Sequence, residues 1–341
     1  MVATMAATSR YAVAHVDPKG PGDARPTAAA IVQDEGMSGK LSDKVILITG
    51  CSSGIGIETA RALLATGAHV FVTARDAVKG QKVVRDLLDS SKGSGRISLL
   101  NLDLTSLESV RACAREFSQR SKQLNILITN AAVMACPESK TKEGFETQFG
   151  VNHLAHFLLF QLLKPTLLAS ATPAFNSRVV SLSSTSHRTT GIHFDDIDCK
   201  KAGYNPWLAY GQAKTANIYF ANEVERRFGS EGLHATSVHP GGIATQLARH
   251  LDAADIKALL SIPGFDMAVK TPEQGAATTV WAAIGKQWEG CGGKYLEDCS
   301  VSEPVQAGVI SPIAPGYAPH AYDVEAAKQL WDLSAKLVGH D

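Results

Sequence analysis

The sequence has no excess of charge of either sign, since 33 lysines and arginines are matched by 33 aspartates and glutamates among its 341 residues. This balance removes the electrostatic argument for a nucleic-acid partner or an anionic membrane surface. No run reaches the roughly 18 consecutive apolar residues of a transmembrane helix, because residues 157–168 are interrupted by Gln161, Lys164 and Pro165. Residues 1–8 lack the basic start and the apolar core of a signal peptide. We therefore expect a cytoplasmic protein with no transmembrane segment and no nucleic-acid partner.

Paired cysteines are also lacking. The six cysteines form no C-x-x-C pair and no Cys/His cluster with the spacing of a zinc site. We expect reduced thiols and no bound metal. Cys51 is the exception that needs separate attention, because it lies inside a glycine-rich loop.

The first 40 residues are expected to form an extension that is partly disordered. Residues 17–26 are dense in proline and glycine, a composition that favours loop or disorder. A short helix is expected at residues 28–34. Residues 41–341 are then expected to form one domain.

Within that domain, short apolar runs alternate with amphipathic helical patterns, and 45% of the residues are apolar, enough for a sizeable core. The strand-like runs are residues 45–49, 69–73, 97–101, 126–130, 178–183 and 235–239. The helical patterns are residues 55–66, 107–119, 147–168 and 210–228, with two more near 272–285 and 324–338. This alternation predicts an α/β fold with a doubly wound parallel sheet of the Rossmann type. Such sheets bind ligands beyond the carboxyl ends of their strands.

The first strand runs into a glycine-rich loop with the spacing G-x-x-x-G-x-G, followed by a helix. Glycines at this turn let the backbone approach a pyrophosphate, and the helix N-terminus supplies free amides. Many glycine-rich loops are only tight turns, but the strand before it and the helix after it favour dinucleotide binding. The residues assigned to this role are Gly50, Ser52, Ser53, Gly54, Ile55 and Gly56.

The second strand ends at Ala74 and Arg75. An enzyme that uses NAD usually has a carboxylate here, whereas a cation suits the 2′-phosphate of NADP. The sequence therefore favours NADP(H), although Arg75 could be an ordinary surface arginine and Asp76 could partly neutralise it.

The third and fourth strands end at Asp103-Leu104 and at Asn130-Ala131. Asp103 could accept a hydrogen bond from the adenine amino group, or it could cap the helix that starts near Ser106. Small residues after Asn130 would allow close packing of a cofactor ribose, with Asn130 bridging backbone and ligand.

The most informative motif is Tyr210-Gly-Gln-Ala-Lys214. Residues four apart on a helix share one face, so the phenol and the ammonium can reach the same ligand. A free phenol has a pKa near 10, too high for efficient proton exchange, and a nearby cation would lower that pKa. A Y-x-x-x-K match is common by chance, but this one follows the fifth strand.

Two further polar positions accompany this motif. Ser183 and Ser184 end the fifth strand, where one hydroxyl could polarise a carbonyl oxygen, and only one of the two can point inward. Asn152 lies on an otherwise apolar helix. A buried asparagine is costly without partners, so it is expected to hold a water or to bridge backbone groups.

Together these motifs closely resemble the short-chain dehydrogenase/reductase family, and most of all its retinol-dehydrogenase-like branch with fungal members. They are T-G-x-x-x-G-I-G at 49–56, N-A-A at 130–132, Asn152, S-S at 183–184, Y-x-x-x-K at 210–214 and H-P-G at 239–241. The resemblance covers about residues 41–300, but not the N-terminal extension. The family's usual N-A-G reads N-A-A here, and His153 follows the helix asparagine.

The resemblance implies roles for these residues. Tyr210 would be the general acid/base, and Lys214 would orient the ribose and lower the phenol pKa. Ser184 would hold the substrate oxygen, and Asn152 would support a water relay to Lys214. Four further residues would contact the nicotinamide end of the cofactor: Pro240, Gly241, Ile243 and Thr245.

We therefore expect an NADP(H)-dependent oxidoreductase that interconverts an alcohol and a ketone or aldehyde. Segments 186–207 and 246–270 are expected to form the substrate pocket, with Trp207, Phe265 and Met267 either lining it or packing elsewhere. The apolar content of these segments predicts a lipophilic or aromatic carbonyl, and NADP preference favours reduction. The histidines at 153, 156 and 187 are expected to be structural or solvated rather than substrate contacts.

Two other functions use the same fold: an NADP(H)-binding regulatory protein, or a non-redox isomerase or dehydratase. Relatives in the family often form homodimers or homotetramers through the two helices flanking the active site, and the extra ends of this chain could block that face.

Overall fold

The computed structural model describes residues 9–91, 95–306, 308, 311 and 313–340. An eight-stranded sheet runs through the protein in the order β3-β2-β1-β4-β5-β6-β7-β8. The strands are β1 (Val45–Ile48), β2 (His69–Ala74), β3 (Arg96–Asn101), β4 (Ile126–Thr129), β5 (Ser177–Leu182), β6 (Leu233–His239), β7 (Tyr295–Glu297) and β8 (Ser300–Val301). All pairings are parallel except β7 with β8. The predicted doubly wound parallel sheet is confirmed, with β1 between β2 and β4 at the point where strand order reverses.

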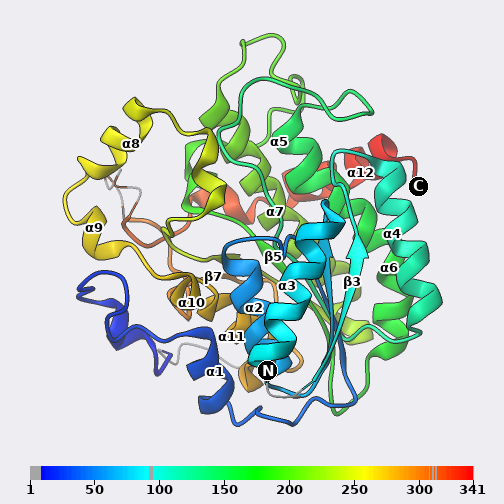
Figure 1. The fold of residues 1–341 in the computed structure, drawn as a ribbon. Coiled ribbons are helices and arrows are strands. Elements are labelled where there is room, and N and C mark those ends of the chain that lie inside the picture. The colour runs from blue at the N-terminus through cyan, green and yellow to red at the C-terminus, as the bar shows by residue number, and fades with distance from the viewer. Residues whose placement is uncertain (1–8, 92–94, 307, 309–310, 312, 341) are drawn as a thin grey trace.

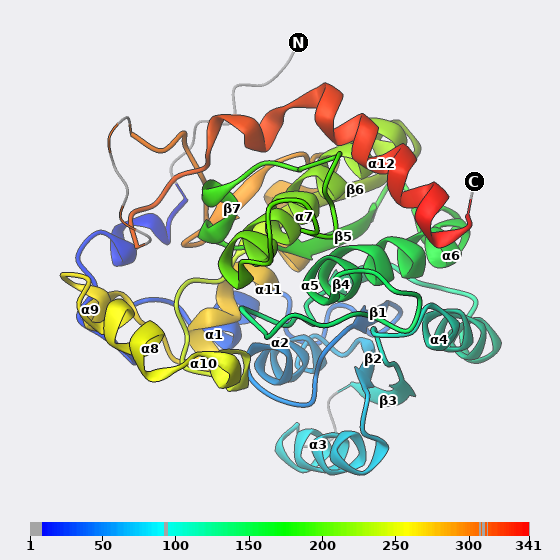
Figure 2. The same ribbon diagram turned by 90° about the horizontal axis from the view of Figure 1, so that it is seen from above.

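Both faces of the sheet are buried, which explains why the strands read as continuous apolar runs. On β1, Val45 and Leu47 face one core while Ile46 and Ile48 face the other. The first core is covered by α4 (Leu107–Arg120), α6 (Ala155–Ser170) and α7 (Pro206–Phe228), and the second by α2 (Ile55–Leu64), α3 (Ala77–Ser90) and α11 (Ala277–Ile284). Figure 1 and Figure 2 show these helices on the two sides of the sheet.

The expected helix 147–168 consists of three pieces. A short α5 (Thr147–Phe149) leads into a π-helical turn, Gly150–Leu154, and then into α6. Pi-turns inside helices often occur at functional sites, and this one contains Asn152. Elements that were not anticipated from the sequence include the crossover helix α3, the short strands β7 and β8, and the helices α8 (Ala253–Leu260) and α9 (Phe265–Ala268).

The N-terminal segment packs on the body of the protein over residues 9–40. Its helix α1 (Ala28–Asp34) contributes Ile31 and Val32 to the second core, beside α11. Residues 17–26 contain neither helix nor strand, and Arg25 within them is buried. In Figure 1 the N-terminal segment, drawn in dark blue, lies against α10 (Pro272–Gly275) and α9 (Phe265–Ala268).

The C-terminal helix α12 (Val324–Val338) lies across α7 and α6 (Figure 2). Trp331 is the centre of this contact, with its ring centroid 5.0 Å from that of Phe157. Leu330 and Ala327 are buried in the same core. The outer faces of α6 and α7 are thus partly covered by the chain itself.

Candidate active site

One large cavity, with a volume of about 2170 Å³, lies at the carboxyl ends of the strands. All the residues that the sequence assigned to dinucleotide binding line it, from Gly50 through Arg75, Asp103 and Asn130 to Thr245. Ser184, Tyr210 and Lys214 line it as well, whereas Asn152 does not. The structure thus brings nearly the whole predicted set around one space.

The glycine-rich loop has no room for side chains. Gly50 has a φ of +74°, and a Cβ there would lie 2.6 Å from the Cα of Ala131. A Cβ on Gly56 would lie 2.7 Å from Asn130 Nδ2. Helix α2 begins directly after Gly54, which provides no side-chain cap. The first amides of α2 therefore remain available to an anion.

Cys51 faces away from this cavity. Its side chain is buried in the second core, and its Sγ lies 3.6 Å from the carbonyl oxygen of Ile48. Burial raises the pKa of the Cys51 thiol to about 12. The thiol therefore packs as a small apolar group and carries no reactive role.

The adenosine end of the cavity has two cations rather than one. Arg75 and Lys79 are both exposed and both line it. Asp76 accepts from the backbone N–H of Lys79 at 3.0 Å and caps α3. Lys79 was missed from the sequence, because without α3 nothing indicated that it lies one helical turn beyond Arg75.

Asp103 does not cap α4. That helix is capped by Ser106, whose hydroxyl accepts from the N–H of Ser109. Asp103 instead accepts from the N–H of Thr105 at 3.0 Å and from its hydroxyl at 2.8 Å. Of the two roles considered, the helix cap is therefore excluded, and Asp103 is left lining the cavity.

Asn130 joins the loop to β4 and keeps one group free. Its Nδ2 donates to the carbonyl oxygens of Thr49 at 2.8 Å and Gly50 at 3.2 Å. Its Oδ1 is buried with no hydrogen-bond partner among the described residues. Buried polar atoms are rarely left unpaired, so this oxygen is a natural acceptor for a bound group.

A closed hydrogen-bond chain connects the loop to Asn152. Thr49 Oγ1 accepts from the amides of Asn130 at 2.9 Å and Ala131 at 3.0 Å, so its proton goes to His156 Nε2 at 3.0 Å. The proton of His156 must then be on Nδ1, which donates to the carbonyl of Asn152 at 3.1 Å. Burial lowers the pKa of His156 to about 4, which keeps the ring neutral. His156 is thus a structural residue, as predicted.

The side chain of Asn152 bridges backbone groups. Its Oδ1 accepts from the N–H of Val133 and its Nδ2 donates to the carbonyl of Val133, both at 2.9 Å. The bridge fixes the segment after β4 against the π-turn. Of the two roles considered for Asn152, this is the one that its contacts show.

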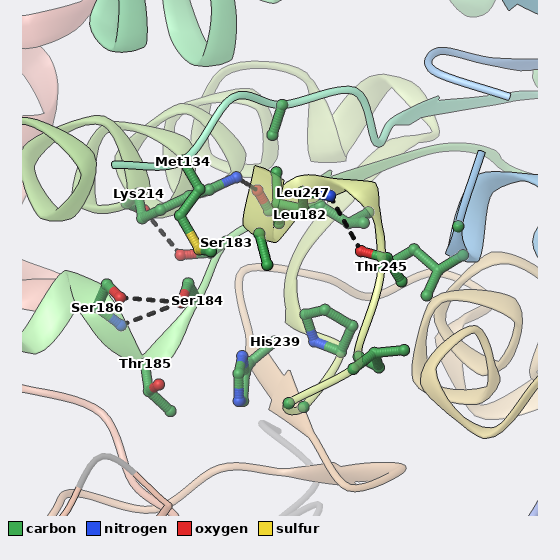
Figure 3. A pocket seen from close by; sticks show the side chains of 18 of the residues that line it. Met134, Leu182, Ser183, Ser184, Thr185, Ser186, Lys214, His239, Thr245 and Leu247 are labelled. Carbon is green, nitrogen blue, oxygen red and sulfur yellow. Dashed lines mark hydrogen bonds between the residues drawn. The ribbon is translucent and has the colours of Figure 1, made fainter. Parts of the chain in front are cut away.

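Tyr210 and Lys214 lie one turn apart on α7 and are both buried. Lys214 Nζ is 5.5 Å from the centroid of the Tyr210 ring and donates to the carbonyl of Leu182 at 2.9 Å. The Ser184 hydroxyl, which donates to Ser186 Oγ at 3.3 Å, is near enough to the Tyr210 phenol to lower its pKa. Ser183 instead donates to the carbonyl of Lys214 at 2.7 Å (Figure 3). Ser184 is therefore the serine that shares the site with the phenol.

The charges at this site differ from the sequence-based expectation. Burial raises the pKa of Tyr210 above its ordinary value, while the nearby Ser184 hydroxyl lowers it by less. Burial also lowers the pKa of Lys214 to about 7. The prediction of a lowered phenol pKa is thus wrong for this structure, because desolvation of the phenol outweighs the opposing effect of Ser184.

The substrate end of the cavity has walls from four parts of the chain. Segment 246–270 contributes through α8 (Ala253–Leu260) and α9, whose lining includes Ile256, Phe265 and Met267. Of the expected segment 186–207, only Ser186, Arg188, Thr189 and Trp207 line the cavity, and Trp207 is held by a 3.0 Å hydrogen bond to Asp255. This differs from the expectation that the whole segment would form a wall.

Two walls come from ends of the chain that the sequence did not associate with the site. They are residues 15–18 and most of residues 313–320. His187 joins the second wall to the site, because its Nδ1 donates to the carbonyl of Ser184 at 2.7 Å and its Nε2 accepts from the amide of Ala318 at 3.1 Å. His153 is bonded to Ser334 at 2.7 Å. Both histidines are therefore structural, as predicted.

Two features are absent from the described residues. No helix among them is long and apolar enough to cross a membrane. No group of three or more histidine, cysteine, aspartate or glutamate side chains in that part of the chain is arranged to hold a metal ion.

This chain belongs to the short-chain dehydrogenase/reductase family, whose model, described as short chain dehydrogenase, matches residues 44–255. Its relatives include the short-chain dehydrogenase/reductase prx1 of Penicillium roqueforti, 50% identical over 96% of this chain and 95% of the relative. Human retinol dehydrogenase 11 is 38% identical over 88% of this chain and 87% of its own. The crystal structure of the Pseudomonas aeruginosa RhlG/NADP active-site complex is similar with a TM-score of 0.58 and 26% identity, over 76% of this chain and 96% of that one. The retinol-dehydrogenase-like branch is thus confirmed, and with it an oxidoreductase acting on CH–OH or carbonyl groups.

Proposed function

We propose that this protein is an NADP(H)-dependent oxidoreductase that reduces a lipophilic or aromatic ketone or aldehyde, with Tyr210 as general acid. The observation that carries the proposal is the placement of Ser184, Tyr210 and Lys214 on the same cavity as the glycine-rich loop. The segment from Pro240 to Thr245 lies on that cavity too. A nicotinamide ring held there would bring the reacting carbon to the two hydroxyls.

The residues fit a dinucleotide. The loop closes against Ala131 so tightly that a Cβ on Gly50 would not fit, and the amides at the start of α2 are free for a pyrophosphate. The unpaired Oδ1 of Asn130 is an acceptor for a ribose hydroxyl or an amide. When bound, the nicotinamide supplies or removes the hydride at the carbonyl or carbinol carbon.

The protein itself supplies the proton that the carbonyl oxygen takes up during reduction. Tyr210 is protonated at neutral pH because burial raises the pKa of its phenol. Its hydroxyl and that of Ser184 converge, so both can donate to a carbonyl oxygen placed between them. During reduction that oxygen gains negative charge and takes the Tyr210 proton, and Lys214 on the same helix face stabilises the phenolate that remains.

Asn152 acts in this scheme as a positioning residue. Its amide bridge to Val133 and the bond from His156 to its carbonyl fix the π-turn behind the cavity. We propose that this turn forms a fixed wall behind Lys214, whose ammonium lies near enough to His156 to help lower the pKa of that ring.

The preference for NADP(H) is supported by two exposed cations at the adenosine end, Arg75 and Lys79. A 2′-phosphate carries more negative charge than a 2′-hydroxyl and is favoured by such a pair. The similar RhlG structure is an NADP complex. The cavity wall near Trp207 is apolar through Leu251, Ile256 and Leu259, which favours a lipophilic substrate.

The test is to follow NADPH absorbance with a panel of ketones and aldehydes, beside the variant Tyr210→Phe. We expect turnover to fall by about 10³-fold with unchanged NADPH affinity, because only the proton donor is removed. Tyr219→Phe is the matched control, since Tyr219 lies on the same helix but bonds the carbonyl of His320 and does not line the cavity. Equal losses in the two variants, or retained activity in Tyr210→Phe, would contradict the assignment.

A further inference from the structure

Beside the nicotinamide end, the cavity contains a polar cluster that the proposed chemistry does not use. It consists of His15, His239, Lys270 and Asp298, all of which line the cavity. They come from the N-terminal segment, the end of β6, the segment before α10, and the turn between β7 and β8. Lys270 Nζ lies 3.4 Å from the carbonyl of Pro240, so the cluster directly adjoins the segment assigned to the nicotinamide.

The charges of the cluster are balanced internally. Lys270 Nζ is 2.6 Å from Asp298 Oδ1, and His15 Nδ1 is 3.2 Å from the same oxygen. The side chain of Lys270 is 3% exposed, so it needs this counter-charge. Its ammonium is therefore not free to bind an anionic substrate, and the available groups of the cluster are hydrogen-bond acceptors.

Two of these acceptors have no partner. In the tautomer whose Nδ1–H donates to the carboxylate, His15 presents Nε2 as an acceptor. His15 Nε2 is buried, in a side chain that is 7% exposed, and has no hydrogen-bond partner among the described residues. Asp298 Oδ2 has none in that part of the chain either, and its side chain is 37% exposed, although it is enclosed by the cavity walls. A group that donates hydrogen bonds would satisfy both.

His239 extends the cluster toward the catalytic serine. Its Nδ1 is buried without a partner among the residues described. Burial, more than the nearby Lys270, lowers the pKa of its ring, so His239 is neutral and offers an acceptor or one N–H. Figure 3 shows its ring in the cavity on the side of Ser184 and Thr185. A substrate held at Ser184 would therefore pass His239 on its way to His15.

The backbone holds Asp298 in this position under strain. Asp298 and Cys299 form the two-residue turn between β7 and β8, and both have a φ of +51°. Such turns strongly prefer Asn-Gly or Asp-Gly, because the left-handed region is unfavourable for other residues. Non-glycine residues persist in such conformations mainly where a site requires them. Here the turn aims the Asp298 carboxylate at His15 and Lys270.

The wall that carries His15 is fixed to the body. The Arg25 guanidinium donates to the carbonyls of Gly20 at 2.9 Å, Ala268 at 2.8 Å and Val269 at 2.7 Å. Gln274 accepts from the N–H of Gly22 at 3.0 Å. These bonds span the N-terminal segment and the segment around α9, so His15 faces the cavity from a defined position.

We propose that His15, Asp298 and His239 form a second recognition point for a hydroxyl group of the substrate, remote from its reacting carbonyl. This proposal rests on the proposed function and deepens it: the substrate class becomes a lipophilic carbonyl compound that also bears a hydroxyl. The aliphatic wall of α8 would hold the chain between the two oxygens.

The test compares equilibrium binding of 1-alkanols and α,ω-alkanediols of four to ten carbons, about the length that such a cavity admits, by calorimetry with and without NADP⁺. At one chain length we expect the diol to bind about tenfold more tightly than the alcohol, beyond the roughly twofold statistical advantage of its two ends. In His15→Phe, which keeps a ring but no acceptor, the excess should disappear. His15→Gln keeps an acceptor and should retain part of it.

His193→Phe is the control, because His193 is an exposed histidine that does not line the cavity. No diol excess at any length in the native protein, or the same excess in His15→Phe, overturns the proposal. Asp298→Asn is the less clean variant, since it leaves buried Lys270 without a counter-charge. Turnover of alkanals and ω-hydroxyalkanals with NADPH is measured in parallel: failure of both series overturns the proposed function, while the binding ratio still decides the hydroxyl site.

Discussion

The cofactor half of the cavity and its substrate half are built in different ways. The first consists of strand ends and loops from β1 to β4, within residues 45–131, where each functional residue follows a regular strand. The second joins residues 15–18, 246–270 and 313–320, which are separated by most of the chain. The cofactor half is thus specified by local sequence patterns, whereas the substrate half depends on contacts that form only in the folded chain.

The largest effect is expected at the junction of the halves, from Lys214→Met. Loss of the ammonium should reduce turnover by about 10³-fold and also stabilise the fold. Leu182 O keeps the donor Asn217 Nδ2 at 2.8 Å, so no carbonyl is left unpaired. The pKa of Lys214 is lowered from 10.5 to about 7, so burying its charge costs most at or below pH 7.

The sign of the pH dependence follows from that shift. Between pH 7 and 10.5 the unfolded chain holds a proton on Lys214 that the folded chain lacks, so wild-type stability rises with pH in this window. Lys214→Met should be more stable by about 2–4 kcal/mol at pH 6, and the difference should shrink toward pH 10. Denaturant unfolding at several pH values measures it. A variant less stable than wild type at pH 6 would contradict the expectation.

A large effect confined to the cofactor half is expected from Gly56→Ala. The added methyl would lie 2.7 Å from Asn130 Nδ2 and closer still to the carbonyl of Gly50. We expect NADPH affinity to fall by about 100-fold, because the loop must move away from its close approach. The control is Gly191→Ala, where nothing lies within 4 Å of a new Cβ. Fluorescence titration with NADPH measures both affinities, and the affinity of the Gly191→Ala control should equal that of the wild type.

A moderate effect on cofactor choice is expected from Arg75→Ala. The ratio of kcat/KM with NADPH to that with NADH should fall about tenfold or more, since one cation facing the 2′-phosphate is lost. Lys79→Ala should act in the same direction by less, and the double variant should exceed either. Were the ratio to stay constant in the double variant, the cofactor assignment would be wrong.

The smallest effect, and the sharpest for the comparison, is expected from Arg25→Met. Met fills similar space but loses the ion pair with Asp23 and the bonds to the carbonyls of Gly20, Ala268 and Val269. KM for carbonyl substrates should rise severalfold, as the wall loosens, while NADPH affinity stays unchanged. A matching loss of NADPH affinity would show that the two halves are not independent. Arg85→Met, an exposed arginine on α3, is the control.

The sequence predicted the sheet because most of its first six strands are buried and rich in apolar and β-branched residues, although in the edge strand β3 only Leu100 is buried. Strand β7 has only three residues, Tyr295–Glu297, and derives its place from pairing with β6 rather than from its own pattern. Helix α3 buries only Gly80, Val83 and Leu87, so its apolar stripe is too sparse to detect. Its existence could have been inferred, since parallel neighbours β2 and β3 require a crossover.

The site divides along the same line. Tyr210 and Lys214 could be found because their relation is one helical turn, and Arg75 because it follows a strand. His15 and Asp298 could not, because 283 positions separate them and no periodicity connects such partners. The phenol pKa was predicted in the wrong direction for a related reason: burial dominates it, and burial depends on the whole fold.

Helix α12 has a practical consequence for anyone who trims or extends this protein. It follows directly on the wall formed by residues 313–320 and covers Phe157 and Phe220. Deleting α12 would expose the aromatic side chains that it covers, and it would also leave residues 313–320, one wall of the cavity, without their attachment to the body of the protein. The deletion would also expose the apolar faces of α6 and α7 that α12 covers. We therefore expect the shortened chain to self-associate through these faces.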